Sequence, residues 1–466
     1  MKNKVQLITY VDRLTGGGIP ELSSLLNGPM AGMFGGVHML PFFYPIDGAD
    51  AGFDPIDHTK VDERIGDWES VANLAQTHDV MADIIVNHMS AQSPQFQDLL
   101  QKGEHSEYAP LFLTMDQVFP EGATEEELLT IYRPRPGLPY SVLSLADGSK
   151  RLFWTTFTSN QIDIDVLHPQ GETYLEGILS RFHEAGVSLI RLDAAGYAVK
   201  KAGSSCFMIP ETYDFIAAFT TKAQALGMKV LVEIHAYYQE QIAIAKRVDY
   251  VYDFALPPLV LHAMFKGTAA YLKKWLSVSP RNAITVLDTH DGIGIIDIGP
   301  SEERPGLVPN EDIDLIVETI HERSQGQSRK ATGAAASNLD LYQVNCTYYD
   351  ALGRDDQQYL LARMIQFFVP GIPQVYYTGA LAEPNDMDLL ARTNVGRDIN
   401  RHYFAFGEAE KALQRPVVQQ LAGLMRFRNH HPAFGGRFQL LDTAENILAI
   451  RWDQEGEFAA LKIDFS

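Results

Sequence analysis

The sequence contains little cysteine: Cys206 and Cys346 are the only two in 466 residues, and they form no CxxC pair. Their separation excludes a disulfide framework and a cysteine zinc site, and it favours a reducing compartment. No stretch reaches the ~18 consecutive apolar residues of a membrane-spanning helix. The N-terminal segment MKNKVQLITYVDR lacks the apolar core of a signal peptide. We therefore expect a cytoplasmic protein that makes no membrane contact.

Basic residues are also scarce, because 38 Lys and Arg face 59 Asp and Glu and leave a formal net charge of −21. Such an excess of negative charge argues against nucleic acids and anionic membranes as partners. The hydrophobic share of 46% and the charged share of 21% are those of a globular protein with a sizeable core. Any anion that binds this chain must find a local cluster of cations.

Short apolar runs alternate with helical patterns along most of the chain. Eight of the runs are apolar on both faces, as buried parallel strands are; they cover residues 5–10, 35–43, 80–89, 187–197, 229–238, 248–256, 283–292 and 370–379. Because each run is followed by a helical pattern, the alternation predicts an α/β fold, a (β/α)8 TIM barrel.

Two insertions and a tail interrupt this repeat. Residues 89–168 are rich in Pro, Gly and aromatic residues and hold no clean strand–helix unit, and a second irregular segment, 293–352, follows the seventh strand. The tail contains three short strand patterns. We expect the barrel in residues 1–88, 169–292 and 353–434, an inserted domain B in 89–168, an inserted domain B′ in 293–352, and a short C-terminal β domain in 435–466.

Polar residues recur where the predicted strands end, which is where TIM-barrel active sites lie. They stand in four short strings: Asp83, Asn87 and His88 in DIIVNH, Arg191 and Asp193 in IRLDAAG, Glu233 and His235 in VEIH, and His290 and Asp291 in DTHD. A single Asp at such a place is more often a helix cap than a catalyst. Three carboxylates, each beside a His or Arg, are hard to obtain as caps and predict one pocket.

Converging carboxylates without a thiol or serine nucleophile fit glycosyl transfer with retention of configuration. Asp193 would be the nucleophile, held ionised by Arg191 on the same strand face. Glu233 would be the general acid, kept protonated by the neighbouring anion, and it would become the base once Asp193 is esterified. Asp291 would stabilise the cationic transition state and fix sugar hydroxyls.

The ordered strings DIIVNH, QIDID, IRLDAAG, VEIH and DTHD resemble the short motifs of the α-amylase family of retaining glycosidases and transglycosidases. In that family the positions that match Asp193, Glu233 and Asp291 are nucleophile, acid/base and transition-state stabiliser. His88 and His290 suit hydroxyl contacts better than metal ligation, because no metal-ligand spacing accompanies them.

Longer strings resemble the bacterial sucrose phosphorylases over nearly the whole chain; they include VQLITY, FGGVHMLPFF, GADAGFDPIDH, YRPRPGLPY, VYDFALPP, TVLDTHDGIG, AAASNLDLYQVN and GRDINRHY. This resemblance implies transfer of glucose from sucrose to inorganic phosphate, giving glucose 1-phosphate and fructose without a cofactor. It implies glucose contacts for Asp50, Phe53, His88, Arg191, Tyr197, His290 and Arg397. It implies acceptor contacts for Arg135, Asp340, Leu341, Tyr342 and Gln343. Asn87 matches a calcium ligand of many amylases, but the resemblance argues against a metal and none is expected.

In YRPRPGLPY, Arg135 stands between two prolines that restrict its backbone, which suits a guanidinium that grips phosphate. The role of Arg133 stays open. The alternatives are a sister phosphorylase acting on sucrose 6′-phosphate or glucosylglycerol, and an α-glucoside hydrolase. A non-catalytic binding or transporter-ancillary protein would be expected to lose the carboxylates and to carry an anchor. The oligomeric state is left open, with a homodimer as one option.

Overall fold

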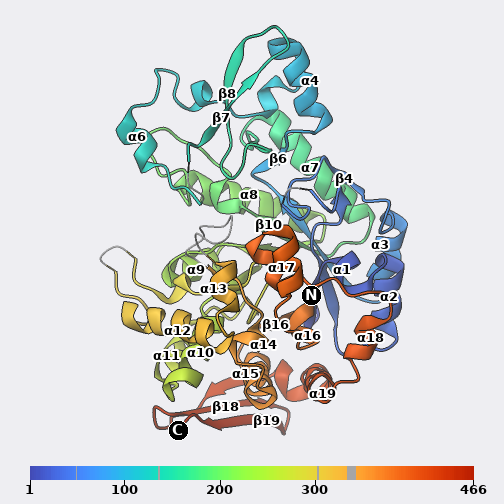
Figure 1. The fold of residues 1–466 in the computed structure, drawn as a ribbon, viewed down its shortest axis with the longest axis vertical. Coiled ribbons are helices and arrows are strands. Elements are labelled where there is room, and N and C mark those ends of the chain that lie inside the picture. The colour runs from blue at the N-terminus through green and yellow to red at the C-terminus, as the bar shows by residue number, and fades with distance from the viewer. Residues whose placement is uncertain (49, 135–136, 302–303, 333–342) are drawn as a thin grey trace. The chain divides into compact units, whose positions relative to one another are not determined.

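The computed structural model describes residues 1–466 except residues 49, 135–136, 302–303 and 333–342. The chain forms two compact units. We call residues 39–234 the central unit, and residues 1–38 together with 235–466 the terminal unit. Each is described by itself below (Figure 1).

Eight strands form a closed barrel in the order β1-β16-β13-β12-β11-β10-β5-β2. Their bounds are β1 (Gln6–Thr9), β2 (Gly36–Met39), β5 (Asp79–Ile85), β10 (Leu189–Asp193), β11 (Lys229–Val232), β12 (Tyr250–Asp253), β13 (Ala283–Thr285) and β16 (Ile372–Tyr376). Each overlaps one of the eight predicted runs, so the predicted α/β barrel is confirmed. The strands are almost wholly buried, as parallel strands covered on both faces must be.

In the central unit, β10 lies between β5 and β11 and pairs with both in parallel. The register sets Arg191 opposite Asp83 on β5 and opposite Leu231 on β11. Because the strands are parallel, residues that follow them emerge at the same edge of the sheet. The helices of this unit are α3 (Trp68–Ala75), α4 (Pro94–Lys102), α5 (Met115–Val118), α6 (Glu125–Thr130), α7 (Pro169–Glu184) and α8 (Pro210–Ala225).

Helices of the central unit begin at residues that commonly cap or start a helix. The Asp67 carboxylate accepts a bond from the Ser70 amide at the start of α3, and Ser93 accepts from Phe96 at the start of α4. Helices α7 and α8 both begin with proline, whose fixed φ suits the first helical position.

Residues 89–168 contribute to two separate two-stranded sheets and to most of one buried cluster. β6 (His88–Ser90) pairs with β9 (Gln161–Asp163), and β7 (Tyr140–Ser144) forms a hairpin with β8 (Lys150–Trp154). A buried cluster holds this segment together; it consists of Leu113, Met115, Phe119, Ile131, Trp154 and Cys206. A further ribbon joins β3 (Phe43–Tyr44) to β4 (Asp57–Val61). The six-part division of the chain stays a prediction.

The terminal unit carries most of the helices that the structure describes. They are α1 (Val11–Thr15), α2 (Ile19–Asn27), α9 (Tyr238–Ile244), α10 (Leu256–Lys266), α11 (Ala270–Val278), α12 (Asn310–Arg323), α13 (Gln327–Ala331), α14 (Tyr348–Ala351), α15 (Asp356–Phe368), α16 (Tyr377–Ala380), α17 (Met387–Thr393), α18 (Glu408–Ala412) and α19 (Pro416–His430). None of the described helices is both long and apolar enough to span a lipid bilayer.

A small antiparallel sheet ends the terminal unit, as predicted. It consists of β17 (Arg437–Leu440), β18 (Ile447–Gln454) and β19 (Glu457–Asp464), drawn in red in Figure 1. The indole of Trp452 on β18 donates a 2.7 Å hydrogen bond to the carbonyl of Phe368, the last residue of α15. A second short ribbon, β14 (Ile293–Gly294) with β15 (Gln343–Val344), follows the seventh barrel strand.

Candidate active site

Arg191 on β10 joins three carboxylates of the central unit. Its Nη1 lies 3.1 Å from Oδ1 of Asp193 and also contacts Asp83, and its Nη2 lies 2.5 Å from Oε1 of Glu233. Arg191 is only 1% exposed. The Arg191–Asp193 contact expected from the sequence is confirmed, whereas the contacts with Asp83 and Glu233 were not predicted. One guanidinium therefore holds both the candidate nucleophile and the candidate acid/base.

Strand register produces this arrangement. Asp83 is the direct cross-strand partner of Arg191, and Asp193 lies two residues on, with its side chain on the same face. Glu233 follows the last residue of β11, and its amide bonds to the carbonyl of Leu192 at 3.4 Å. Three neighbouring parallel strands thus direct one arginine and three acids to the same edge.

The candidate glucose contacts of the central unit lie beside this network. Nε2 of Gln161 donates to Oδ2 of Asp50 at 3.3 Å and lies 3.1 Å from Nε2 of His88. The same His88 nitrogen lies 3.0 Å from the carbonyl oxygen of Phe53, whose ring faces the Arg191 guanidinium at 5.5 Å. Burial lowers the pKa of His88 and favours its neutral form. Gln161 was missed, although the accessory string QIDID begins with it.

Aromatic rings connect this cluster to the segment YRPRPGLPY. Phe157 lies 5.4 Å from the ring of His88 and 5.2 Å from that of Tyr197, measured between centroids. Tyr197 also packs on Phe207 at 4.8 Å, and Tyr132 stacks on Phe207 at 4.6 Å. We call this group of five side chains the aromatic wall; it consists of His88, Tyr132, Phe157, Tyr197 and Phe207. Tyr197, a predicted glucose contact, stands in the middle of it.

Lys200 supplies a buried cation beside Asn87. Its ammonium donates to Oδ1 of Asn87 at 2.6 Å and pairs with Asp163 at 2.7 Å; the side chains of Lys200 and Asp163 are 1% and 0% exposed. The Asn87 oxygen that matches an amylase calcium ligand is thus bound to an ammonium. In the part of the chain that the structure describes, no group of three His, Cys, Asp or Glu is arranged to hold a metal ion.

In the terminal unit, Asp291 lies among two arginines and a histidine. Nη1 of Arg397 lies 2.8 Å from Oδ1 of Asp291, and Nε2 of His290 lies 3.3 Å from Oδ2. Nη2 of Arg401 lies 3.7 Å from the same Oδ1, and its Nε donates to the carbonyl of His290 at 2.9 Å. The predicted His290, Asp291 and Arg397 therefore come together. Arg401 was missed, although GRDINRHY contains it.

Gln343, a predicted acceptor contact, lies on β15 of the same unit. Its Nε2 is 3.0 Å from Nε2 of His235, which stacks on Phe254 at 3.9 Å. Gln343 is buried, and its Oε1 has no hydrogen-bond partner among the described residues. The other predicted acceptor contacts, Arg135, Asp340, Leu341 and Tyr342, lie outside the described residues. The convergence of Asp291 on Asp193 and Glu233 stays a prediction from strand order.

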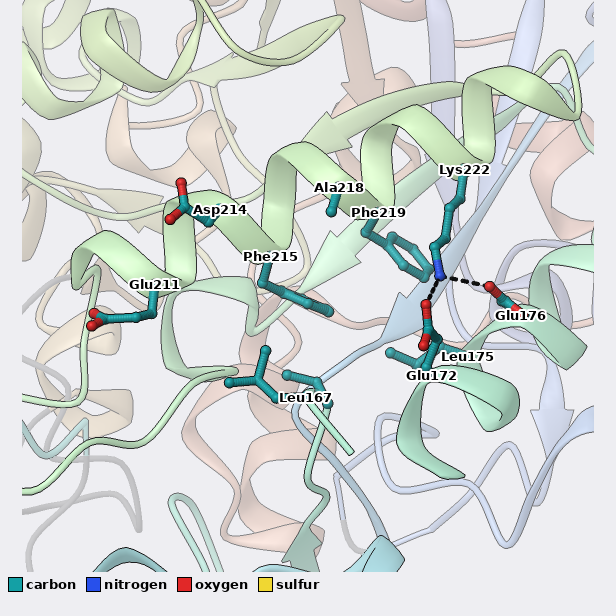
Figure 2. A pocket seen from close by; sticks show the side chains of 11 residues that line it. Leu167, Glu172, Leu175, Glu176, Glu211, Asp214, Phe215, Ala218, Phe219 and Lys222 are labelled. Carbon is teal, nitrogen blue, oxygen red and sulfur yellow. Dashed lines mark hydrogen bonds and ion pairs between the residues drawn. The ribbon is translucent and has the colours of Figure 1, made fainter. Parts of the chain in front are cut away.

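A separate cavity of about 390 Å³ lies between α7 and α8 of the central unit (Figure 2). It is floored by apolar side chains such as Phe215 and Phe219 and contains none of the predicted site residues. Lys222 pairs with Glu172 and, at 2.6 Å, with Glu176 across it. Glu211 and Asp214 also line the cavity, which is therefore mainly acidic at its polar part.

Comparison with known proteins finds similar sequences and a similar solved structure. Residues 33–269 match the family model described as the alpha amylase catalytic domain. The chain is 62% identical to a sucrose phosphorylase of Agrobacterium vitis (100% of this chain, 96% of the relative) and 55% identical to one of Bifidobacterium adolescentis (100% and 92%). The crystal structure of sucrose 6F-phosphate phosphorylase from Thermoanaerobacter thermosaccharolyticum matches with a TM-score of 0.92 at 37% identity. That match covers 100% of this chain and 94% of that one.

Proposed function

The chain belongs to the α-amylase family, and we propose that it catalyses the reversible phosphorolysis of sucrose to α-D-glucose 1-phosphate and D-fructose. The main structural support for the proposed mechanism is the position of Arg191, which contacts both Asp193 and Glu233. A shared guanidinium keeps the two carboxylates close together. Retaining enzymes need this closeness, with carboxyl groups about 5 to 5.5 Å apart, whereas inverting enzymes leave room for a water.

In the first half-reaction, a carboxylate oxygen of Asp193 attacks the anomeric carbon of the glucosyl group. The bond from that carbon to the fructosyl oxygen breaks, and Glu233 delivers its proton to the departing oxygen. Arg191 stabilises the ionised Asp193 and holds the two acids in position. The products of this step are fructose and a glucosyl ester on Asp193.

In the second half-reaction, an oxygen of inorganic phosphate attacks the same carbon from the opposite face. The ester bond to Asp193 breaks, its carboxylate is restored, and Glu233 accepts the proton that the attacking phosphate releases. Two inversions at one carbon give net retention, so the glucose 1-phosphate keeps the α configuration.

Asp291 stabilises the cationic transition states of both steps, and Arg397 with His290 holds its carboxylate. The glucosyl group is bound by Asp50, Phe53, His88, Arg191, Tyr197, His290 and Arg397. The contacts that link Asp50, Phe53, His88 and Arg191 within the central unit support this assignment.

The acceptor side is proposed to use Arg135, Asp340, Leu341, Tyr342 and Gln343. Arg135 and Tyr342 would hold phosphate, and Asp340 and Gln343 would hold fructose hydroxyls. The Oε1 of Gln343, which is buried and accepts no hydrogen bond from the described residues, supports its part, because a sugar hydroxyl could donate to it.

The alternatives are a sister phosphorylase or an α-glucoside hydrolase. A phosphorylated fructose would require additional cations around the acceptor, whereas the string SNLDLYQ supplies an acid. The identities of 62% and 55% to sucrose phosphorylases also exceed the 37% to the sucrose 6F-phosphate enzyme. The two free, buried cysteines are compatible with a cytoplasmic location, which we also propose.

The test is to incubate the purified protein with sucrose, with and without phosphate, and to measure glucose 1-phosphate against free glucose. We expect glucose 1-phosphate to dominate when phosphate is present. Free glucose formed at the same rate with and without phosphate would identify a hydrolase instead. Turnover of sucrose 6′-phosphate or glucosylglycerol but not of sucrose would identify a sister phosphorylase.

A further inference from the structure

We propose that Arg133, a residue without a role in the assignment above, binds the incoming inorganic phosphate and thereby favours it over neutral acceptors. The inference rests on the proposed phosphorolysis and is argued from Arg133 alone, because Arg135 lies outside the described residues.

Arg133 is a half-buried guanidinium with very few hydrogen bonds. Its Nη1 reaches the carbonyl oxygen of Thr155 at 3.5 Å, the outer limit for such a bond. Its Nε is buried without an acceptor, and no carboxylate among the described residues forms an ion pair with it. Arg363, which is fully buried, shows the usual contrast: it pairs with Asp288 at 2.8 Å and donates to Gln366 at 2.9 Å. Arg133 therefore retains unused donors.

The charge of Arg133 is also poorly compensated. Asp163 is the carboxylate that acts on it electrostatically, but Asp163 already pairs with Lys200 at 2.7 Å and accepts a bond from the Thr156 amide at 3.0 Å. Burial lowers the pKa of Arg133, which means that its surroundings solvate the cation poorly. An anion placed against the free donors would supply the compensation that the protein does not.

The position of Arg133 relates it to the glucosyl site. Tyr132, its neighbour, is fixed by stacking on Phe207 and by a 2.9 Å bond from its amide to the carbonyl of Ser205. The Tyr132 ring also stacks on Tyr197, with centroids 6.2 Å apart. Arg133 is thus held beside the aromatic wall, which includes two of the proposed glucose contacts, Tyr197 and His88.

Phosphate is the reactant that this arrangement fits. A guanidinium can donate two parallel bonds to two phosphate oxygens, and such charge-assisted bonds are stronger than those to neutral hydroxyls. Fructose and water carry no charge and gain little from an extra cation. Arg133 should therefore matter when the glucosyl group is transferred to phosphate and matter little when it is transferred to water.

The test compares Arg133→Gln and Arg133→Lys with wild type. For Arg133→Gln we expect the KM for phosphate to rise about tenfold or more, with sucrose hydrolysis in the absence of phosphate unchanged within about twofold. The KM for phosphate of Arg133→Lys should lie between those of wild type and Arg133→Gln, because lysine keeps the positive charge but cannot donate two parallel hydrogen bonds. As a matched control, Arg151→Gln removes another arginine of the central unit, one paired with Glu104 at 2.7 Å, and should leave the KM for phosphate unchanged.

Binding is checked without turnover by the rise in melting temperature that phosphate causes, which should shrink in Arg133→Gln. An unchanged KM for phosphate, or equal losses of hydrolysis and phosphorolysis in both Arg133 variants, would overturn the inference. A wild-type protein that forms no glucose 1-phosphate would instead contradict the proposed function, so the two failures are distinguishable.

Discussion

Glu233 and Asp193 share one cation, because Nη2 of Arg191 lies 2.5 Å from Oε1 of Glu233 while its Nη1 lies 3.1 Å from Oδ1 of Asp193. The two acids are therefore coupled in position as well as in charge. In the proposed mechanism, esterification of Asp193 would remove one of the three anions that Arg191 contacts and leave Glu233 and Asp83. The proposed base of the second half-reaction would then be held by the same guanidinium that stabilises the proposed nucleophile in the first.

Replacing Arg191 by lysine tests this coupling. An ammonium keeps the charge, but it cannot present two nitrogens to two carboxylates at once. We expect kcat to fall by about 10²- to 10³-fold, in the range of a lost transition-state donor. The control is Arg181→Lys on α7, a partly exposed arginine paired with Glu184, which should retain full activity. Near-normal kcat in Arg191→Lys, with circular dichroism unchanged, would show that the bridge is dispensable.

Glu233→Gln should separate the two acceptors. Ionised phosphate needs less help from a base than water does, so hydrolysis of the glucosyl-enzyme should fall by about 10²-fold or more and its phosphorolysis by much less. The measurement uses an activated glucosyl donor with a good leaving group, because the first step then needs little acid assistance. Equal losses of the two rates would count against Glu233 as the base.

Lys200 and Asp163 form a buried ion pair whose loss should be costly. Removing one partner leaves a charge without compensation, so Lys200→Met and Asp163→Asn should each lower the free energy of unfolding by about 3 to 5 kcal/mol. In the double variant the free energy of unfolding should fall by less than the sum of the two single losses, because neither charge then remains. Lys222→Met is the matched control, since its partners Glu172 and Glu176 are exposed and the loss should stay below about 1 kcal/mol. Denaturant titration measures all four, and strictly additive losses would contradict the pairing.

Asp253 gives a prediction for pH. Burial raises its pKa to about 6, although it accepts bonds from the Trp275 indole at 3.0 Å and from the Leu256 amide at 3.0 Å. Because the pKa of Asp253 is higher in the folded than in the unfolded state, the native state holds this proton more tightly. The contribution of Asp253 to the free energy of unfolding is therefore fully present below about pH 4 and is lost as the pH rises through about 6. Asn at 253 keeps a carbonyl acceptor without the charge.

For Asp253→Asn we expect a free energy of unfolding that exceeds that of wild type by an amount that grows between pH 4 and pH 7, to about 3 kcal/mol at most. Urea titrations at several pH values measure it. A difference between the two proteins that does not change with pH would show that Asp253 does not titrate in this range.

Local patterns in the sequence predicted the barrel and part of the site. The eight strands were found because each is a short apolar run, and Arg191 was placed beside Asp193 because alternate residues of a strand share a face. The contact between Arg191 and Glu233 was not predictable in this way, because it depends on the register between β10 and β11.

Other partners were missed for the same reason. Lys200 and Asp163 are 37 residues apart in the sequence, and no periodicity relates a turn after β10 to the end of β9. Arg401 lies near Arg397 in GRDINRHY, but only the path of the chain there brings its guanidinium toward Asp291. Long-range pairs of polar residues carry no local signal, whereas buried strands do.

The ammonium of Lys200 reaches Asn87 and Asp163 on a side chain that is part of the polypeptide. A cation attached in this way cannot dissociate, cannot be extracted by a chelator and does not compete with other ions in the medium. The positive charge at that place is set when the chain is synthesised, and its local concentration does not change with dilution.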